Sequence, residues 1–353
     1  MENMLRLVTG RIGCGKTARI YEEIRKITEQ GGEVTLVVPE QYSFHTEKKM
    51  LEMLGARDAD RVNVVSFSFL AKNLLKKYGL NSEKSLDDST RAMLMSVALD
   101  EAGDDLQVYS RHRYSPAVIL QMLKTLKDFR QCSVTSDKIE ETLAKLKPSL
   151  LKDKLGEILL IDRTYTALVE QNYFDDDCAL DILCDVLDEH RDFDGAEVFV
   201  DGFRGFTAQE YAVLERIMHQ SAETWVTLCV DKADDEFGVF AHTFRTKRKL
   251  IRCAQKSGTD IAKPELLTRD GSIDPELNAL EKGLYSGGAE IYGEKTKKIT
   301  LCSAEDFESE CEFVACTIKR LIRTENIRCR DIAVISRSEN NYSRQCAPLC
   351  GLQ

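Results

Sequence analysis

The sequence predicts an α/β protein with a parallel sheet, organised around a glycine-rich loop near its start and interrupted by an all-helical insertion. The residues Gly10–Thr17 fit the pattern G-x-x-x-x-G-K-[ST] in full. Short apolar runs alternate with helical periodicity over residues 1–80 and again after residue 193, which is typical of parallel strands joined by helices. Residues 81–192, in contrast, show helical periodicity and no strand-like run.

Length and composition limit the class of protein. The chain has 353 residues, of which 43% are hydrophobic and 31% charged, enough for two or three packed domains. No apolar run is long enough to span a membrane, and the first strand begins too early to leave room for a signal peptide. We therefore expect a soluble cytoplasmic protein with no membrane partner. The net charge of −10 argues against a uniformly basic surface for nucleic acid but leaves a local basic groove open.

The twelve cysteines are scattered, and none forms a C-x-x-C pair. This pattern predicts reduced, mostly buried thiols rather than a disulfide framework or a metal site. The cysteines are Cys14, Cys132, Cys178, Cys184, Cys229, Cys253, Cys302, Cys311, Cys316, Cys329, Cys346 and Cys350.

The glycine-rich loop lies between a strand-like run, Leu5–Val8, and a helical pattern, Ala18–Thr28. Its glycines allow the backbone to bend tightly and to bring N–H groups close to a phosphate. Lys16 is expected to reach the β and γ phosphates, and the Thr17 hydroxyl to bind Mg²⁺. The predicted nucleotide ligands in the loop are Gly10, Gly13, Cys14, Gly15, Lys16 and Thr17.

Two further strands, Glu33–Val38 and Arg61–Val65, each lead into a segment with polar and aromatic residues. The segments Pro39–Phe44 and Ser66–Phe69 follow the carboxyl ends of their strands, where open α/β sheets bind ligands. Such residues suit single-stranded nucleic acid, but they serve equally well as helix caps, and both readings stay open. Helices are expected from about His45 to Leu54 and from Ser66 to Tyr78. The second has a lysine row typical of a solvated face, Lys72, Lys76 and Lys77.

The insertion contains helical patterns at residues 90–101, 115–130, 136–147 and 155–171. Its acidic run Asp175–Asp177 precedes an apolar helix. We interpret the run as N-terminal helix charges rather than as a metal site.

After the insertion, the apolar strand Ala196–Val200 ends in Asp201, the expected second Mg²⁺-side carboxylate. Taken alone, Asp201 followed by Gly202 would be a turn, but the complete loop upstream favours the metal role. Thr207 and Glu210 have the spacing of a capping box for a helix at 208–218. A further strand, residues 225–230, ends in Asp231.

The last third of the chain begins with a basic helix at 244–256, interpreted as a solvated face or as a surface that tracks DNA. Its basic residues are Arg245, Lys247, Arg248, Lys249 and Arg252, and Phe237, Phe240 and Phe244 precede them. Residues 257–297 are expected to be an irregular connection with one short helix. A second α/β unit then begins with a strand at 298–301, a helix at 307–323 and a strand at 331–335.

These motifs together resemble the N-terminal part of the AddB family, called RexB in some bacteria. The resemblance rests on the glycine-rich loop, Val38–Gln41, Val65–Phe67, the helical insertion, Phe199–Phe203, Phe206–Glu210 and Asp331–Arg337, in that order. Family members are helicase-like and nuclease subunits of an ATP-dependent enzyme that processes broken DNA ends for recombination, and they are much longer than this chain.

The resemblance implies a RecA-like first domain with a helical insertion, followed by a truncated second RecA-like domain, with ATP between them. It also implies roles for Lys16, Thr17 and Asp201 at the nucleotide, and a γ-phosphate contact for Arg337. The DNA-contact candidates are Gln41, Tyr42, Ser66 and Phe67. The predicted segments are 1–80 and 193–256 (first domain), 81–192 (insertion), 257–297 (connection) and 298–353 (second domain).

The family further implies AddA as the partner protein, and single- and double-stranded DNA ends as ligands. Its nuclease domain and 4Fe-4S cluster belong to a far C-terminal region, so none of the twelve cysteines inherits the cluster role. We expect DNA contacts from the loops around Gln41 and Ser66 rather than from the acidic insertion.

Two departures from active helicases weaken the prediction of a motor. Gly202 stands where those enzymes have a glutamate, and no adenine-reading glutamine precedes the loop. We therefore expect weak ATP–Mg²⁺ binding and negligible hydrolysis. A protein-binding scaffold with a vestigial nucleotide site remains an alternative, as does, more remotely, a small-molecule kinase.

Overall fold

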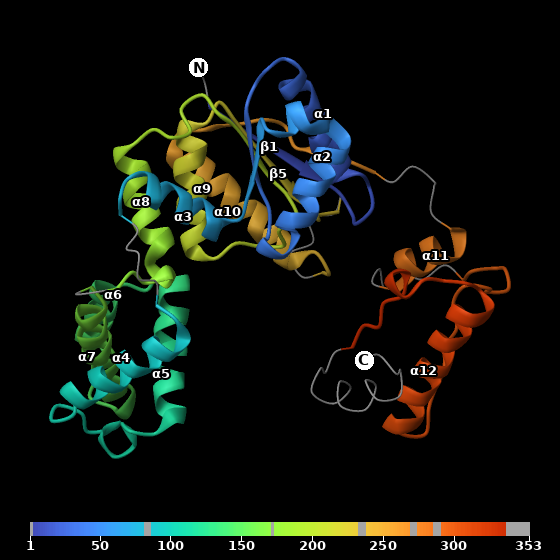
Figure 1. Ribbon diagram of the computed structural model, residues 1–353. Helices are drawn as coiled ribbons and strands as arrows, with labels where there is room; N and C mark the ends of the chain where they lie inside the picture. Colours follow the sequence, from blue (N-terminus) through green and yellow to red (C-terminus); the bar gives the residue numbers. More distant parts are fainter. Residues whose placement is uncertain are drawn as a thin grey trace. The chain divides into compact units, whose positions relative to one another are not determined.

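The computed structural model describes residues 3–80, 86–170, 173–231, 238–268, 274–284 and 291–336. The chain divides into two compact units, Met1–Gly271 and Ser272–Gln353 (Figure 1). Among the described residues, no helix combines the length and the apolar character needed to cross a membrane.

The first unit is built on a sheet whose described strands all pair in parallel, which confirms the predicted α/β class. The order of the strands is β3-β2-β4-β5-β1-β6, and β7 also pairs with β1. Because all pairs are parallel, the carboxyl ends of the strands share one edge of the sheet. The strands are β1 (Met4–Thr9), β2 (Val34–Val37), β3 (Val62–Val65), β4 (Glu197–Val200), β5 (Glu223–Leu228), β6 (Asp260–Ile261) and β7 (Glu265–Leu266).

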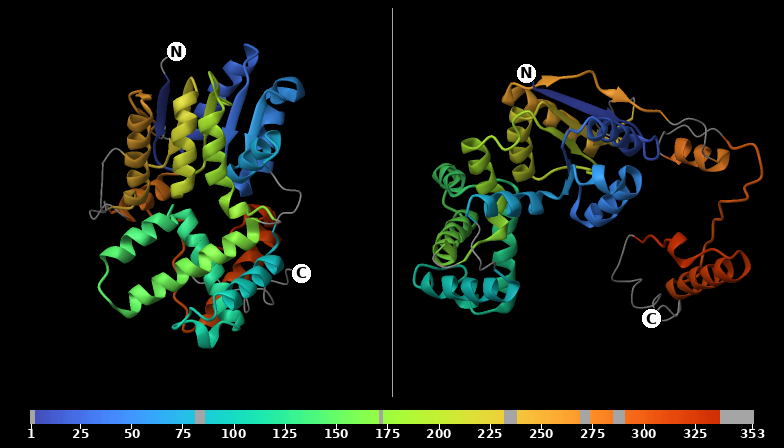
Figure 2. Two further views of the ribbon diagram at one scale, coloured as in Figure 1. Left: turned by 90° about the vertical axis from the view of Figure 1, so that its left-hand side faces the viewer. Right: turned by 45° about the horizontal axis from the view of Figure 1, so that its top comes forward.

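Helices cover both faces of this sheet (Figures 1 and 2). On one face, Ile24 and Met50 from two helices pack against Leu36 and Phe199. Val37 is the next residue after Leu36 and packs with the helices on the opposite face, as the period of a strand requires. The first face carries α1 (Lys16–Glu29) and α2 (Ser43–Ala59). The second carries α3 (Phe67–Lys77), α8 (Ala179–Glu189), α9 (Ala208–Gln220) and α10 (Ala241–Ser257).

The chain between β3 and β4 contains a separate helical core. Met95, Leu99, Leu126, Ile161 and Tyr165 are almost completely buried within it. The helices that build this core are α4 (Asp88–Glu101), α5 (Pro116–Gln131) and α7 (Leu150–Glu170), with α6 (Ser136–Lys145) packed on α7. Short 3-10 turns, η2 (Ser110–His112) and η3 (Asp176–Cys178), join these elements. The last helix before β4, α8, instead packs against α3 and α9 on the sheet.

Two predicted strands are not formed in the second unit. Residues 298–301 and 332–335 are extended or irregular, and Asp331 lies in the 3-10 turn η4 (Cys329–Asp331). The backbone N–H groups of Lys298 and Ile299 donate instead to the carboxylate of Glu276. A strand needs a neighbour to pair with, and the described part of this unit has the helices α11 (Pro275–Leu284) and α12 (Phe307–Thr324) but no strand.

The sequence also missed two strands. The segment interpreted as an irregular connection contains β6 and β7, which pair with opposite ends of β1. Each has two residues, too short for a hydrophobic period to be detected in the sequence. They add backbone hydrogen bonds along β1 directly before the glycine-rich loop.

We expect Glu197→Gln to stabilise the protein more at about pH 8 than at about pH 5. Partial burial and the neighbouring Glu223 charge, opposed by Arg6, raise the pKa of Glu197 to about 7. Between its usual pKa and this raised value, the unfolded chain releases the proton that the folded chain keeps, so folding weakens as the pH rises. The glutamine side chain stays neutral and avoids this loss. Urea denaturation of both proteins at the two pH values measures it.

The control for this experiment is Asp87→Asn. The Thr90 N–H bond lowers the pKa of the Asp87 carboxyl, so its stabilising charge is present above the unfolded pKa and is lost as the pH falls. The asparagine variant should therefore gain no stability with rising pH. A stability difference for Glu197→Gln that is equal at both pH values would contradict the account.

Candidate functional site

The glycine-rich loop joins the carboxyl end of β1 to the first turn of α1. Gly10, Gly13 and Gly15 have positive φ angles of 151°, 76° and 86°, which favour glycine. At Gly10 space is limiting as well, because an added Cβ atom would lie 2.5 Å from the carbonyl oxygen of Leu267. Gly15 is the N-cap of α1 and offers no side chain, so the first N–H groups of the helix face the loop without a side-chain cap.

Lys16 is held over the loop by backbone oxygens. Its ammonium group donates to the carbonyl oxygens of Gly10 at 2.9 Å and Arg11 at 2.8 Å. Its Nζ also lies 3.8 Å from the sulfur of Cys14. The positive charge of the lysine therefore lies against the backbone of the loop.

Thr17 and Asp201 are in direct contact although they are far apart in the sequence. The Thr17 hydroxyl donates to Asp201 Oδ2 at 2.8 Å, across a separation of 184 residues. The Thr227 hydroxyl of β5 donates to the other carboxylate oxygen, Oδ1. Only 7% of Asp201 is exposed. The strand order explains the contact, because β5 lies between β1 and β4 and all three carboxyl ends meet at one edge.

Arg11 of the loop is paired with Asp231, the carboxylate that follows β5. Arg11 Nε lies 2.9 Å from Asp231 Oδ2. The guanidinium also lies over the ring of Phe240, 5.9 Å from its centre. The second carboxylate at this edge is therefore engaged by the loop itself.

The residues after Asp201 form a backbone that suits glycine and a helix cap. Gly202 has a φ of 82°, a left-handed conformation that disfavours other residues. Thr207 and Glu210 form the predicted capping box: the Glu210 carboxylate accepts the Thr207 N–H at 2.7 Å, and the Thr207 hydroxyl accepts the Glu210 N–H at 3.2 Å. Glu210 is thus committed to the start of α9.

The four candidate DNA-contact residues divide into an exposed and a buried pair. Gln41 and Tyr42 lie exposed in the 3-10 turn η1 (Glu40–Tyr42), whereas Ser66 and Phe67 are 5% and 4% exposed. Ser66 caps α3 by accepting the N–H of Phe69 at 3.2 Å. The Phe67 ring packs edge-on against other aromatic rings of the core, those of Phe203 and Phe206.

Two exposed aromatic residues of the same predicted segments, Phe44 (80% exposed) and Phe69 (51%), were not among the four named candidates. Phe69 follows Phe67 by two residues, which on a helix turns its side chain to nearly the opposite side. The repeated pattern Ser-Phe-Ser-Phe held this signal, since only one of its aromatic residues can face the core.

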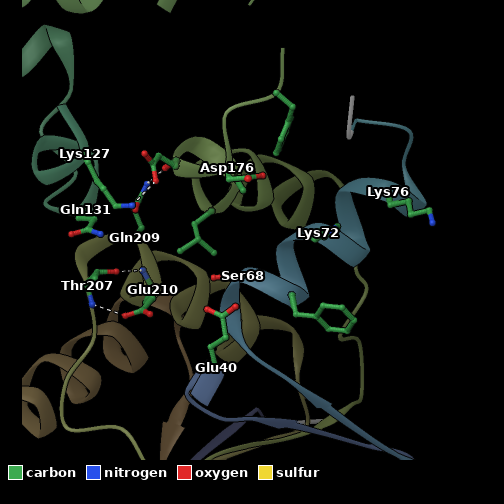
Figure 3. Close-up of a pocket in the computed structure, with 15 residues that line it drawn as sticks. Glu40, Ser68, Lys72, Lys76, Lys127, Gln131, Asp176, Thr207, Gln209 and Glu210 are labelled. Carbon is green, nitrogen blue, oxygen red and sulfur yellow. Dashed lines mark hydrogen bonds and ion pairs between the residues drawn. The ribbon is translucent and has the colours of Figure 1, made fainter. Parts of the chain in front are cut away.

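A cavity of about 790 Å³ lies beside these residues (Figure 3). Lys72, Lys76 and Phe69 of α3 line one side of the cavity. Lys127 and Gln131 of α5 also line it and belong to the helical segment, by which we mean the chain from α4 to η3. Ser68 of α3 also lines it. The other lining residues come from η1, from η3 with the residues on either side of it, and from the start of α9: Glu40, Phe174, Asp176, Asp177, Ala179, Leu180, Thr207, Gln209 and Glu210.

The lysine row on α3 is exposed, as predicted, but its members differ in their partners. Lys72 and Lys76 line the cavity and form no ion pair with any residue that the structure describes. Lys77, in contrast, pairs with the buried carboxylate of Asp192. Two of the three predicted surface lysines therefore offer charge to a ligand in the cavity.

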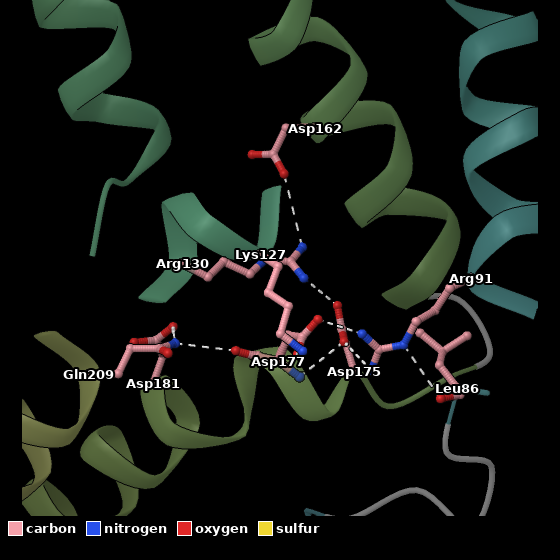
Figure 4. Close-up of polar contacts among 9 residues, drawn as sticks. All are labelled: Leu86, Arg91, Lys127, Arg130, Asp162, Asp175, Asp177, Asp181 and Gln209. Carbon is pink, nitrogen blue, oxygen red and sulfur yellow. Dashed lines mark hydrogen bonds and ion pairs between the residues drawn. The ribbon is translucent and has the colours of Figure 1, made fainter. Parts of the chain in front are cut away.

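An ion-pair network lies next to the cavity and joins α4, α5 and, through the Arg130–Asp162 pair, α7 to η3 (Figure 4). Asp175 pairs with Arg91 at 3.1 Å and with Arg130. Asp177 pairs with Arg91 and, at 3.1 Å, with Lys127. Asp175 also caps η3, by accepting the N–H of Asp177 at 3.1 Å, as the interpretation of this acidic run as helix-end charges predicted. The sequence did not reveal the arginines, which lie far from it along the chain.

Gln209 connects this network to the sheet. It is 4% exposed, and its amide donates to the Asp177 carbonyl oxygen at 3.2 Å and to Asp181 Oδ2 at 2.7 Å. The glutamine of the Phe-Thr-x-Gln-Glu motif therefore fastens α9 to the end of the helical segment. The position of Gln209 inside the motif indicated that it has a role, but the sequence did not show that Asp177 and Asp181 are its hydrogen-bond partners.

None of the ten described cysteines is in a disulfide, but the prediction of mostly buried thiols was wrong: Cys184 and Cys311 are buried, four are exposed and four are intermediate. Burial raises the pKa of the Cys178 and Cys184 thiols to about 11, which keeps both protonated. No metal-binding group of three or more His, Cys, Asp or Glu side chains occurs among the residues that the structure describes. Arg337, Cys346 and Cys350 lie outside those residues.

The comparison with known proteins identifies the family. A family model described as "ADDB, N-terminal" matches residues 7–281. The chain belongs to the AddB N-terminal family. Curated relatives, each named as one subunit of an "ATP-dependent helicase/deoxyribonuclease", match along 96% of the chain. They include proteins of Caldanaerobacter subterraneus (31% identical over 347 residues), Thermoanaerobacter sp. (31% over 349) and Clostridium acetobutylicum (29% over 348). The chain spans about 30% of the length of these relatives.

We expect Arg130→Met to lower the free energy of unfolding by up to about 3–5 kcal/mol, because it removes one of the two arginines that pair with the buried carboxylate of Asp175. The Arg130 and Asp175 side chains are 15% and 5% exposed. The matched control is Arg163→Met, whose pair with Glu140 is about half exposed on both sides and should change stability by less than about 1 kcal/mol. Urea denaturation followed by circular dichroism measures both, and equal losses would contradict a structural role for the network.

Proposed function

We propose that this chain is the helicase-like region of an AddB-type component of an ATP-dependent DNA helicase–nuclease, and that it binds ATP–Mg²⁺ and single-stranded DNA with little or no hydrolysis. Family membership supports the general role. The observation that carries the nucleotide part is the hydrogen bond from Thr17 to Asp201, which brings the loop and the strand-end carboxylate together.

The residues at this site fit a nucleotide with its Mg²⁺ ion. Hydroxyl and carboxylate oxygens, here those of Thr17 and Asp201, are the ligands that Mg²⁺ takes from proteins. Lys16 rests on neutral carbonyl oxygens, which a phosphate can replace without breaking an ion pair. In this proposal the Mg²⁺ ion neutralises phosphate charge. The sheet with its helices is the first RecA-like domain, and the second unit is the start of a second RecA-like domain.

Two features argue against efficient hydrolysis. Position 202 is a glycine and cannot act as the general base, which contributes about 10²- to 10⁴-fold to the rate of hydrolysis. The left-handed backbone there would also strain a glutamate side chain. Glu210, the nearest alternative, is held in the capping box of α9. We therefore assign the site to binding, with slow or no turnover.

The cavity beside α3 fits a single DNA strand. Lys72 and Lys76 supply charge for phosphates, and Phe69 supplies an exposed ring for stacking. The remaining lining is polar and includes amide and carboxylate groups such as Gln131 and Glu40, which can bond to base edges. Gln41 and Tyr42 adjoin Glu40 in η1. In this proposal Ser66 and Phe67 support the strand from beneath rather than touch it.

The remaining expectations concern the whole protein. They include an AddA-type partner, double-stranded DNA ends as substrate, a cytoplasmic location, a nuclease domain and a 4Fe-4S cluster outside this chain, and a γ-phosphate contact from Arg337. The second candidate function is a DNA-recognition and protein-binding scaffold whose nucleotide site is vestigial, and the backbone at Gly202 is the observation that favours it.

We expect Lys16→Ala to abolish ATP–Mg²⁺ binding by this chain, because the lysine ammonium group lies against the loop backbone, 2.9 Å from the Gly10 carbonyl oxygen. Isothermal titration calorimetry measures it. The control is Lys26→Ala, which removes an exposed cation at the other end of α1. Phosphate release should be negligible for both variants and for the wild type. Equal binding in wild type and Lys16→Ala would remove Lys16 from the site, and rapid Lys16-dependent release would show a motor.

We expect the double variant Lys72→Gln/Lys76→Gln to bind a single-stranded oligonucleotide about tenfold more weakly at low salt, because phosphate contacts dominate such binding. Fluorescence anisotropy over a salt series measures the loss. The control variant Lys138→Gln/Lys145→Gln removes two charges from α6, away from the cavity. If both double variants lose affinity equally, the cavity is not the binding site.

A further inference from the structure

One face of α10 is basic on a chain that is acidic overall. The helix has six Lys or Arg residues and no Asp or Glu within 17 residues, whereas the whole chain has a net charge of −10. Arg245, Lys249 and Arg252 are exposed and recur every three or four residues, so they lie along one side for about 10 Å. Thr246 and Leu250 on the other side are buried.

These three cations are not neutralised within the part of the chain that the structure describes. None of them forms an ion pair there, in contrast to Lys256 at the end of the same helix, which pairs with Glu215 at 2.9 Å. Lys249 lies over the ring of Tyr211, 5.2 Å from its centre, a contact that leaves its charge available. An uncompensated cationic row of this kind attracts a polyanion.

A second cavity, of about 480 Å³, lies at the beginning of this row. Arg245 and Lys249 line it together with Thr207, Tyr211 and His242. The floor of this cavity is closely packed. The Thr246 hydroxyl donates to the Arg204 carbonyl oxygen at 3.3 Å, and an added Cβ on Gly205 would lie 2.6 Å from the His242 ring.

The two cavities adjoin each other at the start of α9. Thr207 and Glu210 line both the cavity beside α3 and the cavity beside α10. A strand that leaves the first cavity across this segment therefore reaches Arg245 and Lys249 next. A recess partly lined by aromatic rings suits one flexible strand better than a rigid duplex.

We propose that the α10 face formed by Arg245, Lys249 and Arg252 binds the sugar–phosphate backbone of the same single DNA strand, beyond the bases held in the cavity beside α3. This inference rests on the proposed DNA-binding function and extends it. It assigns the basic helix a phosphate-binding role, so that the binding site runs from α3 over the beginning of α9 to α10.

The test uses the triple variant Arg245→Gln/Lys249→Gln/Arg252→Gln and oligothymidylates of about 6 and about 20 nucleotides, in fluorescence anisotropy titrations over a salt series. The triple variant should bind the long oligonucleotide about tenfold more weakly at about 50 mM salt, and with a salt slope shallower by about 2, since each lost phosphate contact removes about 0.7. Binding of the short oligonucleotide should stay within about twofold of the wild type.

Two controls accompany the triple variant. Arg25→Gln/Lys147→Gln/Arg323→Gln removes the same number and kinds of exposed cations elsewhere and should bind both oligonucleotides like the wild type. Arg245→Lys/Arg252→Lys keeps the charge on α10 and should restore most of the affinity for the long oligonucleotide. Circular dichroism establishes that each variant is folded.

The outcomes separate the two proposals. If the wild type binds long and short oligonucleotides and the α10 variant binds both as the wild type does, the α10 inference fails while the DNA-binding function stands. If the α10 variant loses affinity for a duplex of equal length more than for the single strand, the face serves a duplex and the inference is overturned. If the wild type binds no oligonucleotide, the DNA part of the proposed function fails, and the α10 inference fails with it.

Discussion

Parallel pairing of β1, β5 and β4 is the constraint on which the rest of the first unit depends. It places the carboxyl ends of three strands at one edge, so that hydroxyl groups from Thr17 and Thr227 reach the two oxygens of Asp201. The loop conformation then depends on its glycines, and the backbone of Leu267, after β7, leaves no room for a side chain at Gly10. Thr17 and Asp201 are thereby positioned by the first turn of α1 and by the end of a sheet strand, which are rigid elements.

The helical segment is tied to this sheet by polar groups as well as by packing. Buried carboxylates at η3 need arginine partners, which come from α4 and α5, and Gln209 of α9 bonds to the same turn. Burying charges costs a desolvation free energy that pairing offsets only in part, so we infer that such a network contributes more to a defined arrangement than to net stability. It also holds Lys127 beside the cavity that we propose for DNA.

The segment from Asp201 to Glu210 links the proposed nucleotide and DNA sites. It begins at the carboxylate beside Thr17, passes through the left-handed Gly202, and ends in a capping box that lines both cavities. In a protein of this family, binding at one site and binding at the other would therefore act on the same ten residues. In the proposed function, glycine at 202 and the capped Glu210 suit this segment to holding ligands rather than to activating water.

The sequence by itself determined the class of fold, the glycine-rich loop, Asp201 and the capping box, because each depends on local periodicity or on residue types at fixed spacing. Tertiary structure decided which residues are exposed or line a cavity. Ser66 and Phe67 are buried, whereas Phe69 is exposed. Lys77 pairs with the buried carboxylate of Asp192, whereas Lys72 and Lys76 have no such partner among the described residues. The strands predicted at 298–301 and 331–335 do not form, whereas β6 and β7 do, because a strand is stable only when it pairs with a neighbouring strand. Pairing partners distant along the chain are set by the packing of the whole unit, and no local pattern records them.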